Sequence, residues 1–216
     1  MLGFLQFMND FVYLYPLLMS FVWMIGALIF HYRLERKIKL PPPLKEYPFF
    51  SILIPCHNEE GQIEETVAKL MELDYPNYEV ITVDDGSTDR TASILHELSE
   101  KYERVRVVYL RENQGKGAAL NMGCLISGGD FILTIDADAL LDPKALKWMA
   151  WHFYIFPRVG AVTGNPRVLN RTTLLGKIQT GEYASIIGLI KRTQRILGKV
   201  LTVSGVIAAF RKQALL

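Results

Sequence analysis

Residues 130–140 read DFILTIDADAL, a short run of apolar, strand-forming residues that leads directly into two aspartates separated by one alanine. Two carboxylates at the end of a buried strand repel each other and lose hydration, so the pair needs a stabilising partner. A divalent cation that both carboxylates bind is one such partner, and it keeps open positions for phosphate oxygens. The alternative is an ordinary turn in which Asp142 and Pro143 begin the next helix. The surrounding sequence decides between the two.

The stretch is part of a regular alternation of apolar runs and helical periods. Runs at 49–55, 78–85, 105–110 and 131–135 predict strands, of which those at 49–55 and 131–135 are expected to be buried. Helices are predicted over residues 59–73, over the segment that carries Ile94, Leu95 and Leu98, and over residues 116–127. Ser87 or Thr88 is a possible N-cap of the second helix. This alternation predicts an α/β fold, with a mostly parallel, Rossmann-like sheet and helices on both faces.

A polar cluster follows each predicted strand: PCHNEE (55–60), DDGSTD (84–89), NQGKG (113–117) and DAD (136–138). Ligands of open parallel sheets bind in the crevice beyond the carboxyl ends of the strands, so we expect one crevice to collect all four clusters. Lys116 lies between two glycines at a predicted helix start, where backbone N–H groups and an ammonium favour phosphate. Together the clusters favour the cation interpretation of the aspartate pair, with Mg²⁺ or Mn²⁺ as the ion.

Each of the other clusters also has a purely structural interpretation. His57, Asn58 and Glu59 are compatible with a helix N-terminus, and a lone histidine there is more often structural than a ligand. A carboxylate of DDGSTD can accept a hydrogen bond from a nucleobase or a ribose, but turn chemistry explains that motif too. The GxxxxGK[ST] spacing of a Walker loop is absent, and no G-x-G-x-x-G follows the first strand. That absence disfavours a dinucleotide-binding oxidoreductase.

The first 30 residues differ in composition from the rest. Residues 11–30 hold no charged side chain over 20 residues, and a helix of that length spans the ~30 Å hydrocarbon core of a bilayer. The next nine residues, HYRLERKIK, carry four basic side chains, and no Lys or Arg precedes Arg33. This asymmetry predicts a transmembrane helix with its N-terminus outside and the rest of the chain cytoplasmic. Pro41, Pro42 and Pro43 predict a stiff spacer, after which a soluble domain begins near Phe49.

The formal net charge of +2 is too small to argue for a nucleic-acid partner. Cys56 and Cys124 fit no zinc spacing and are expected to stay reduced. Residues 167–199 hold seven basic side chains and one acidic one, interleaved with apolar residues. This pattern predicts either a helix at the lipid headgroup surface or a core-facing helix with a solvated basic side, and both interpretations stay open.

In this order and spacing, PCHNEE, VDDGSTDRT, NQGKGAAL and IDADALL resemble the GT-A nucleotide-sugar fold of family 2 glycosyltransferases. Residues 158–212 resemble the processive membrane synthases within that family that make a biofilm polysaccharide. The resemblance implies inverting transfer of N-acetylglucosamine from UDP-GlcNAc to a growing β-1,6-linked chain at the inner (cytoplasmic) membrane. It implies a transmembrane anchor over 1–32, a basic and Pro-rich linker over 33–48, and a GT-A domain over 49–216. A small membrane accessory subunit is a further implied partner.

The resemblance also implies roles for individual residues. The nucleotide sugar would be bound by Pro55, His57, Asn58, Glu59, Asp85, Lys116 and Asp136. Asp136 and Asp138 would carry catalysis by binding the donor and its cation, with Asp138 in more direct contact with the metal. Ser204, Gly205 and Val206 would meet the acceptor sugar. Asp84 stands where relatives can carry asparagine, so it has less weight than Asp85.

Inverting transfer needs a general base, which the family carries in a Thr-Glu-Asp motif, and a Gln-x-x-Arg-Trp motif completes its site. Both are expected beyond Leu216, so the chain is expected to be C-terminally partial and to make little polymer alone. Three alternatives remain. The first is a transferase for a hyaluronan-, chitin- or cellulose-like polymer. The second is a transferase to a lipid phosphate, against which VTGNPR (162–167) and VSGVIAAFR (203–211) argue. The third is an inactive nucleotide-sugar-binding protein.

Overall fold

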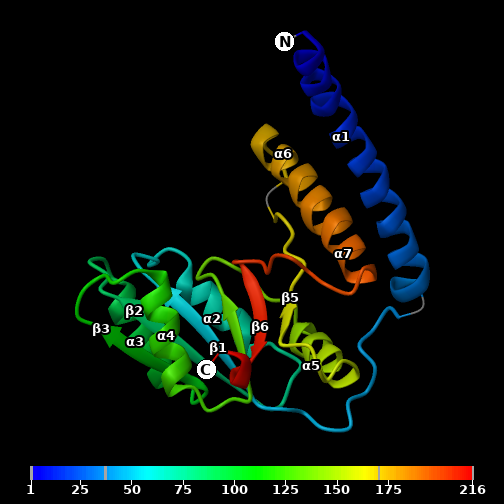
Figure 1. Ribbon diagram of the computed structural model, residues 1–216. Helices are drawn as coiled ribbons and strands as arrows, with labels where there is room; N and C mark the ends of the chain where they lie inside the picture. Colours follow the sequence, from blue (N-terminus) through cyan, green and yellow to red (C-terminus); the bar gives the residue numbers. More distant parts are fainter. Residues whose placement is uncertain (1, 37, 170, 216) are drawn as a thin grey trace. The chain divides into compact units, whose positions relative to one another are not determined.

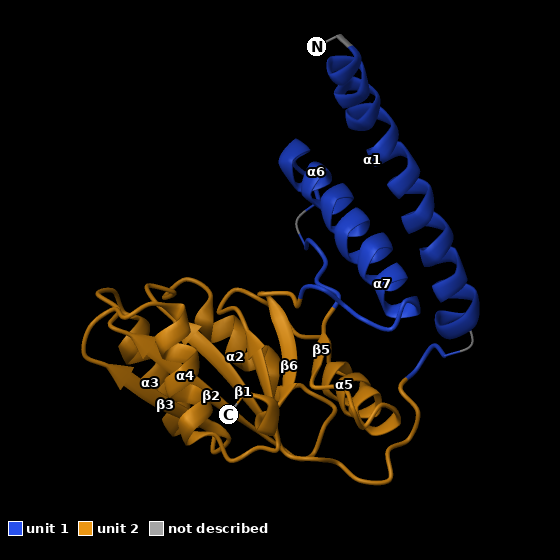
Figure 2. Cartoon of the chain, in the orientation of Figure 1, with its two compact units in different colours: residues 1–40, 165–202 blue, residues 41–164, 203–216 orange. Residues whose placement is uncertain are grey.

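The computed structural model describes residues 2–36, 38–169 and 171–215. The chain folds into two compact units, which Figure 2 colours separately. Unit 1 consists of Met1–Leu40 and Asn165–Thr202, and unit 2 of Pro41–Gly164 and Val203–Leu216. The second segment of unit 1 is therefore inserted into the sequence of unit 2. The boundaries predicted for an anchor, a linker and a catalytic domain are a functional division and stay a prediction.

Unit 2 is built on one six-stranded sheet with the order β3-β2-β1-β4-β6-β5 (Figure 1). The strands are β1 (Phe50–Cys56), β2 (Tyr78–Asp85), β3 (Val105–Leu110), β4 (Phe131–Ile135), β5 (Ala161–Thr163) and β6 (Ile207–Arg211). The first four run parallel, whereas β6 is antiparallel to both β4 and β5. The predicted mostly parallel α/β fold is confirmed. Strands β5 and β6 were not among the predicted elements.

Helices cover both faces of this sheet. They are α2 (Ile63–Met71), α3 (Thr91–Lys101), α4 (Lys116–Ile126) and α5 (Ala145–Ile155). Alternate residues of a strand point to opposite faces, so Ile52 and Leu53 enter different cores. Ile52 belongs to the core that holds side chains of α2, α3 and α5, and Leu53 to the one that holds Ala119 of α4. This arrangement confirms the prediction of a sheet with helices on both faces.

Two details of the predicted helices were wrong. Helix α2 begins at Ile63 rather than near residue 59, because the Glu59 carbonyl accepts hydrogen bonds from the N–H groups of Gln62 and Ile63 in a turn. Neither Ser87 nor Thr88 caps α3, which begins at Thr91. Instead, the Asp89 carboxylate accepts a hydrogen bond from the Thr91 N–H, at 2.9 Å.

Unit 1 is helical. Helix α1 (Leu2–Phe30) continues into a π-helical turn, η1 (His31–Glu35). Gly3–Glu35 is long and apolar enough to cross a membrane, as judged by length and composition. The inserted segment forms α6 (Leu174–Tyr183), η2 (Ala184–Lys191) and α7 (Arg192–Ile196), which follow one another without a break. A helix within the basic region 167–199 is thereby confirmed.

A buried carboxylate stabilises the end of the sheet at which β2 begins. Glu79 is 8% exposed, and its carboxylate accepts hydrogen bonds from the Ser51 hydroxyl (2.6 Å) and the Gly128 N–H (2.7 Å) and pairs with Arg106 (2.7 Å). Burial alone would raise the pKa of Glu79. The three hydrogen bonds and the charge of Arg106 outweigh burial, so the pKa is lowered from its ordinary value.

Glu79→Gln is expected to lower the free energy of unfolding by about 2 kcal/mol near neutral pH, because it removes a charge-assisted network. The lowered pKa makes this stabilisation present above the unfolded-state value and lost as the pH falls through the folded-state value. The difference between wild type and variant should therefore shrink in acid. Denaturant unfolding across this pH range measures it, with Glu72→Gln, which removes the partner of an exposed Lys69 pair, as the control. A difference that stays constant into acid would contradict the assignment.

Candidate active site

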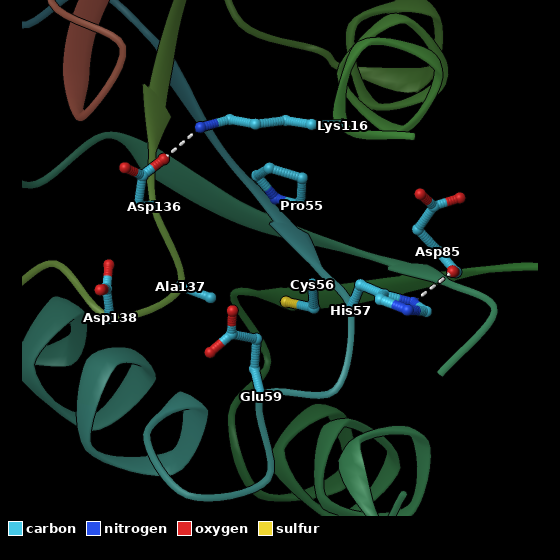
Figure 3. Close-up of a pocket in the computed structure, with 9 residues that line it drawn as sticks. All are labelled: Pro55, Cys56, His57, Glu59, Asp85, Lys116, Asp136, Ala137 and Asp138. Atoms are coloured by element: carbon cyan, nitrogen blue, oxygen red, sulfur yellow. Dashed lines mark hydrogen bonds and ion pairs between the residues drawn. The ribbon is translucent and has the colours of Figure 1, made fainter. Parts of the chain in front are cut away.

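A pocket of about 310 Å³ lies where β1, β2 and β4 end (Figure 3). It is lined by Pro55, Cys56, His57, Glu59, Asp85, Lys116, Asp136, Ala137 and Asp138. All the residues predicted to bind the nucleotide sugar or its cation line it, with the exception of Asn58. The parallel register of β1 with β2 and β4, and of β2 with β3, explains this convergence, because the four strands that the polar clusters follow lie side by side.

The Asp85 carboxylate holds the turn that precedes α4. Its two oxygens accept hydrogen bonds from the N–H groups of Gln114 and Gly115, each at 2.8 Å, and the residue is 3% exposed. Gly115 has a φ of 90°, which favours glycine, and it is directly followed by Lys116 at the first position of the helix. Asp85 therefore fixes the backbone from which Lys116 projects, in addition to lining the pocket.

The His57 ring is locked by its neighbours. Its Nδ1 lies 2.9 Å from the Asp85 carbonyl oxygen, which can only accept, so Nδ1 carries the proton. Its Nε2 faces the amide nitrogens of Asn113 (3.0 Å) and Asn58 (3.4 Å), which donate to it. Both ring nitrogens of His57 are thus engaged by protein, and the residue lines the pocket.

The aspartate pair lies in a turn after β4, with the buried Ala137 between the two carboxylates. The Ala137 carbonyl accepts a hydrogen bond from the Thr66 hydroxyl at 2.7 Å, which ties the turn to α2. Lys116 forms an ion pair with Asp136 across the pocket, whereas Asp138 is exposed (Figure 3). The ammonium therefore relieves part of the repulsion between the two aspartates.

Glu59 adds another carboxylate to the same side of the pocket. Burial raises the pKa of Glu59, and the negative charges of Asp138, Asp136 and Asp89 raise it further. The Cys56 thiol beside it is buried, which raises the pKa of that thiol far above its ordinary value and keeps it inert. The pocket thus presents an acidic wall, formed by Glu59, Asp136 and Asp138, that faces one lysine.

The donor set of this wall fits Mg²⁺ or Mn²⁺ bound together with a diphosphate. Within the described residues, no group of three or more His, Cys, Asp or Glu side chains is arranged as a complete metal cage. Mg²⁺ is usually held by one or two carboxylates together with substrate phosphates, so a full protein cage is not required. The exposed Asp138, with Asp136 beside it, provides the carboxylate oxygens that such an ion takes.

The predicted acceptor residues lie at the start of β6, next to the aspartate turn. Because β6 runs antiparallel to β4, its first residue, Ile207, pairs with Ile135, the last residue of β4. The Asp136 N–H donates to the Val206 carbonyl at 3.2 Å, and the Ser204 N–H donates to the Thr163 hydroxyl at 3.1 Å. Gly205, between them, is exposed. The sheet therefore brings this segment to Asp136, although it does not line the pocket.

Asn58 joins the loop after β1 to the loop after β2. It has a positive φ of 58°, its side-chain oxygen accepts from the Thr88 N–H at 2.8 Å, and its own N–H donates to the Ser87 hydroxyl at 3.0 Å. The Glu59 N–H likewise donates to the Thr91 hydroxyl at 2.8 Å. These bonds place Asn58 as a support for the pocket wall. Its predicted contact with the nucleotide sugar stays a prediction.

Asn58→Ala is expected to destabilise unit 2 by about 2 kcal/mol, because it removes the acceptor for Thr88 and strains a left-handed residue. Asn58→Gly keeps the backbone freedom and should cost about half as much, and Asn58→Asp, which keeps the acceptor, should cost least. Urea unfolding of the three variants measures the order. Equal stability of the alanine and aspartate variants would contradict this role.

Sequence reasoning missed Ala137 and Asn113. Ala137 lines the pocket because it neighbours predicted residues, and an apolar residue between two aspartates gives no signal of its own. Asn113 stands in the NQGKG cluster, but its contact with His57 joins residues 56 positions apart in the chain. Only the adjacency of the loops reveals that contact.

Comparisons with known proteins agree with this geometry. The sequence profile described as "Glycosyl transferase family 2" matches residues 51–216. The chain is 40% identical over 214 residues to a poly-β-1,6-N-acetyl-D-glucosamine synthase of Staphylococcus aureus (strain MSSA476), and the match covers 97% of this chain and 52% of that protein. The chain thus spans about half the length of the curated relatives it matches.

Two solved structures share the fold. The mannosyltransferase PcManGT from Pyrobaculum calidifontis, in complex with GDP-Man and Mn²⁺, matches with a TM-score of 0.67 and 25% identity over 88% of this chain and 53% of its own. S. aureus TarS 1–349 in complex with UDP-GlcNAc matches with a TM-score of 0.54 and 25% identity over 76% of this chain and 45% of its own. The profile match covers most of the sequence, including every residue that lines the pocket. The chain belongs to glycosyl transferase family 2.

Proposed function

We propose that this chain forms the donor-binding part of a membrane-bound inverting glycosyltransferase, which transfers N-acetylglucosamine from UDP-GlcNAc to a growing β-1,6-linked polysaccharide. The observation that carries the proposal is the convergence of Asp136, Asp138 and Lys116 in one pocket. Asp85, the last residue of β2, lines the same pocket. The name of the S. aureus synthase and the UDP-GlcNAc bound to TarS support the choice of sugar and nucleotide.

In this proposal the diphosphate lies between Lys116 and the acidic wall. The ammonium of Lys116 and the backbone N–H groups at the start of α4 meet the phosphate oxygens. Asp138, with Asp136, holds Mg²⁺ or Mn²⁺. When bound, that ion supplies positive charge to the departing nucleotide diphosphate. The acidic wall alone would repel a diphosphate, so donor binding should depend on the cation.

The uridine is proposed to lie over the loop after β1. Pro55 and the ring face of His57 provide a flat surface for the base, and the Glu59 carboxylate lies on the side of the acidic wall. The Asp85 carboxylate donates no proton, but each of its oxygens keeps a lone pair after accepting from the turn at 114–115. Those lone pairs can accept from a uracil N–H or a ribose hydroxyl.

The acceptor sugar is proposed to meet Ser204, Gly205 and Val206, next to the aspartate turn. Inverting transfer needs a base that takes the proton of the attacking 6-hydroxyl.

The bilayer is a proposed partner of the first helix. Residues 1–32 would act as an anchor in the inner membrane, with the N-terminus outside, and residues 33–48 would lead into a cytoplasmic GT-A domain over 49–216. The apolar helix Gly3–Glu35 supports this arrangement. The growing polysaccharide and a small membrane subunit are the other proposed partners, and nucleic acid is not one of them.

Titration calorimetry of the chain in detergent tests the proposal. UDP-GlcNAc is expected to bind in the presence of Mn²⁺ and to lose most of its affinity in EDTA, whereas NAD is expected not to bind. UDP-glucose and GDP-mannose measure how far the pocket selects the sugar and the base. Binding of NAD, or uridine nucleotide binding that does not depend on the metal, would contradict the proposed site.

A further inference from the structure

One face of α1 is covered within unit 1. Met19, Trp23 and Phe30 are partly buried and Gly26 and Ala27 are buried, while most of the helix is exposed. These positions recur at intervals of three and four, which places them on a single face. The elements that cover this face are η2 and α7 of the inserted segment (Figure 2).

The contact is close because Gly26 has no side chain. A Cβ at residue 26 would lie 2.2 Å from Cγ2 and 2.7 Å from Cβ of Thr193. The Thr193 hydroxyl also lies 2.9 Å from two carbonyl oxygens, that of Trp23 across the interface and that of Leu189 in its own helix, and its single proton is shared between them. A glycine that makes room for a side chain of the neighbouring helix, together with a threonine hydroxyl that reaches a carbonyl across the interface, is typical of helix pairs inside membranes.

The contact lies at a definable depth along α1. Trp23 and Gly26 belong to the uncharged run 11–30, and Gly26 is four residues from its end, a rise of about 6 Å. Just beyond that end, Glu35 Oε1 lies 2.8 Å from both Nε and Nη2 of Arg192. If α1 is inserted over its apolar run, Thr193 lies at the edge of the hydrocarbon layer and the Glu35–Arg192 pair lies among the headgroups.

The inserted helix also exposes apolar side chains. Leu174, Leu175, Ile178 and Ile186 are 77%, 66%, 59% and 46% exposed. Lys177 and Glu182 are exposed on the same helix, so it is unsuited to cross the hydrocarbon core and suited to the interface. Basic residues outnumber acidic ones seven to one over 167–199, which favours anionic headgroups.

We propose that helix 174–196 is a second membrane-associated element, which lies in the headgroup layer against the cytoplasmic end of α1 and takes anionic lipid as the partner of its exposed apolar side. The proposal rests on α1 being the membrane anchor of the proposed function. It goes further, because the inserted segment continues directly into Ser204–Val206. The acceptor segment is then tied at its N-terminal side to the bilayer surface rather than to a free cytoplasmic loop.

Depth-dependent quenching tests this placement in the full chain, reconstituted into vesicles of zwitterionic and anionic lipid that carry nitroxide-labelled acyl chains. A fluorophore is attached to Val22→Cys, Ile186→Cys or Leu125→Cys in a Cys124→Ser background, in which the remaining Cys56 is 1% exposed. Val22 reports α1, and Leu125, 69% exposed on α4, is the aqueous control. We expect Val22 and Ile186 to be quenched several-fold more than Leu125, and Ile186 to lose quenching when the anionic lipid is omitted.

The outcomes separate this proposal from the anchor itself. Quenching at Val22 with none at Ile186 beyond that at Leu125 would overturn the proposal and leave the anchor intact. No quenching at either position would overturn both. Quenching at Ile186 that does not depend on anionic lipid would overturn the choice of lipid partner.

A glycine substitution tests the contact with α1. Gly26→Leu is expected to reduce quenching at Ile186 at least twofold while quenching at Val22 is retained, because the new side chain would collide with Thr193. Gly3→Leu is the matched control on the same helix, since a Cβ there meets nothing within 4 Å. Equal quenching at Ile186 in the two variants would show that the Gly26–Thr193 contact does not hold the helix in place.

Discussion

Replacing Asp138 by asparagine is expected to lower the affinity for UDP-GlcNAc in the presence of Mn²⁺ by roughly tenfold or more, a loss of about 1.4 kcal/mol or more. Asp138 is the exposed carboxylate of the pocket, whereas Asp136 is paired with Lys116. An amide has the same shape but lacks the charge that a hard divalent ion requires. The variant should also lose most of the difference between affinity measured with Mn²⁺ and in EDTA, which calorimetry reads directly.

Asp142→Asn is the matched control for this experiment. Asp142 is exposed four residues further along the chain, and its carboxylate accepts from the Lys144 N–H at 2.8 Å, which an asparagine oxygen can also do. That variant is expected to bind as the wild type does. Unchanged metal-dependent binding by Asp138→Asn would remove the main support for the proposed donor site.

Asp85→Asn is expected to reduce both stability and donor affinity. Each Asp85 oxygen accepts one backbone N–H, from Gln114 or Gly115, so an asparagine must turn its amide nitrogen towards one of these donors. Losing a charge-assisted bond and leaving a donor unpaired costs about 3 kcal/mol. Because the turn at 114–115 positions Lys116, the affinity for the nucleotide diphosphate should fall as well. Urea unfolding and calorimetry measure the two effects.

Asp84→Asn is a demanding control, because Asp84 is the preceding residue and is also buried. Both of its hydrogen bonds, from the Ser87 N–H and hydroxyl, meet a single oxygen, Oδ1, which asparagine retains. This variant should lose much less stability than Asp85→Asn and keep its affinity for the donor. If both variants lost the same amount, general loss of a buried charge would explain the effect and the specific role of Asp85 would be wrong.

Much of the fold could be read from the sequence because its central strands are buried on both faces. The runs at 78–85 and 131–135 coincide with β2 and β4, since a central parallel strand is a continuous apolar run with abrupt ends. The run at 105–110 coincides with β3, which is a half-exposed edge strand. Strands β5 and β6 could not be read in the same way. β5 has three residues, and β6 is recognisable only through its antiparallel pairing with β4 and β5.

The chemical character of the site could also be predicted from the sequence. The hydrogen bonds between loops that hold the site in place could not. Carboxylates, a lysine and glycines after successive strands predicted a phosphate and metal pocket, and the structure brings those side chains together. The bonds between Asn58 and Thr88, and between Asp85 and the turn at 114–115, join loops about 30 residues apart. Such contacts follow from strand order and register rather than from local pattern.

The repulsion within the aspartate pair has a second source of relief that the sequence did not disclose. Lys116 pairs with Asp136, so the ammonium compensates one of the two negative charges. This leaves Asp138 as the carboxylate available to a metal ion. The ammonium of Lys116 can bind a phosphate group only when a bound cation neutralises Asp136 in its place.

A crystal structure of the chain with UDP and Mn²⁺, with the ion located by its anomalous scattering, tests the central claim most directly. The proposed site predicts a manganese peak at a bonding distance of about 2.2 Å from an Asp138 oxygen, shared with the diphosphate, and the uracil beside His57. Manganese and nucleotide bound elsewhere, with Asp138 still facing solvent, would contradict it.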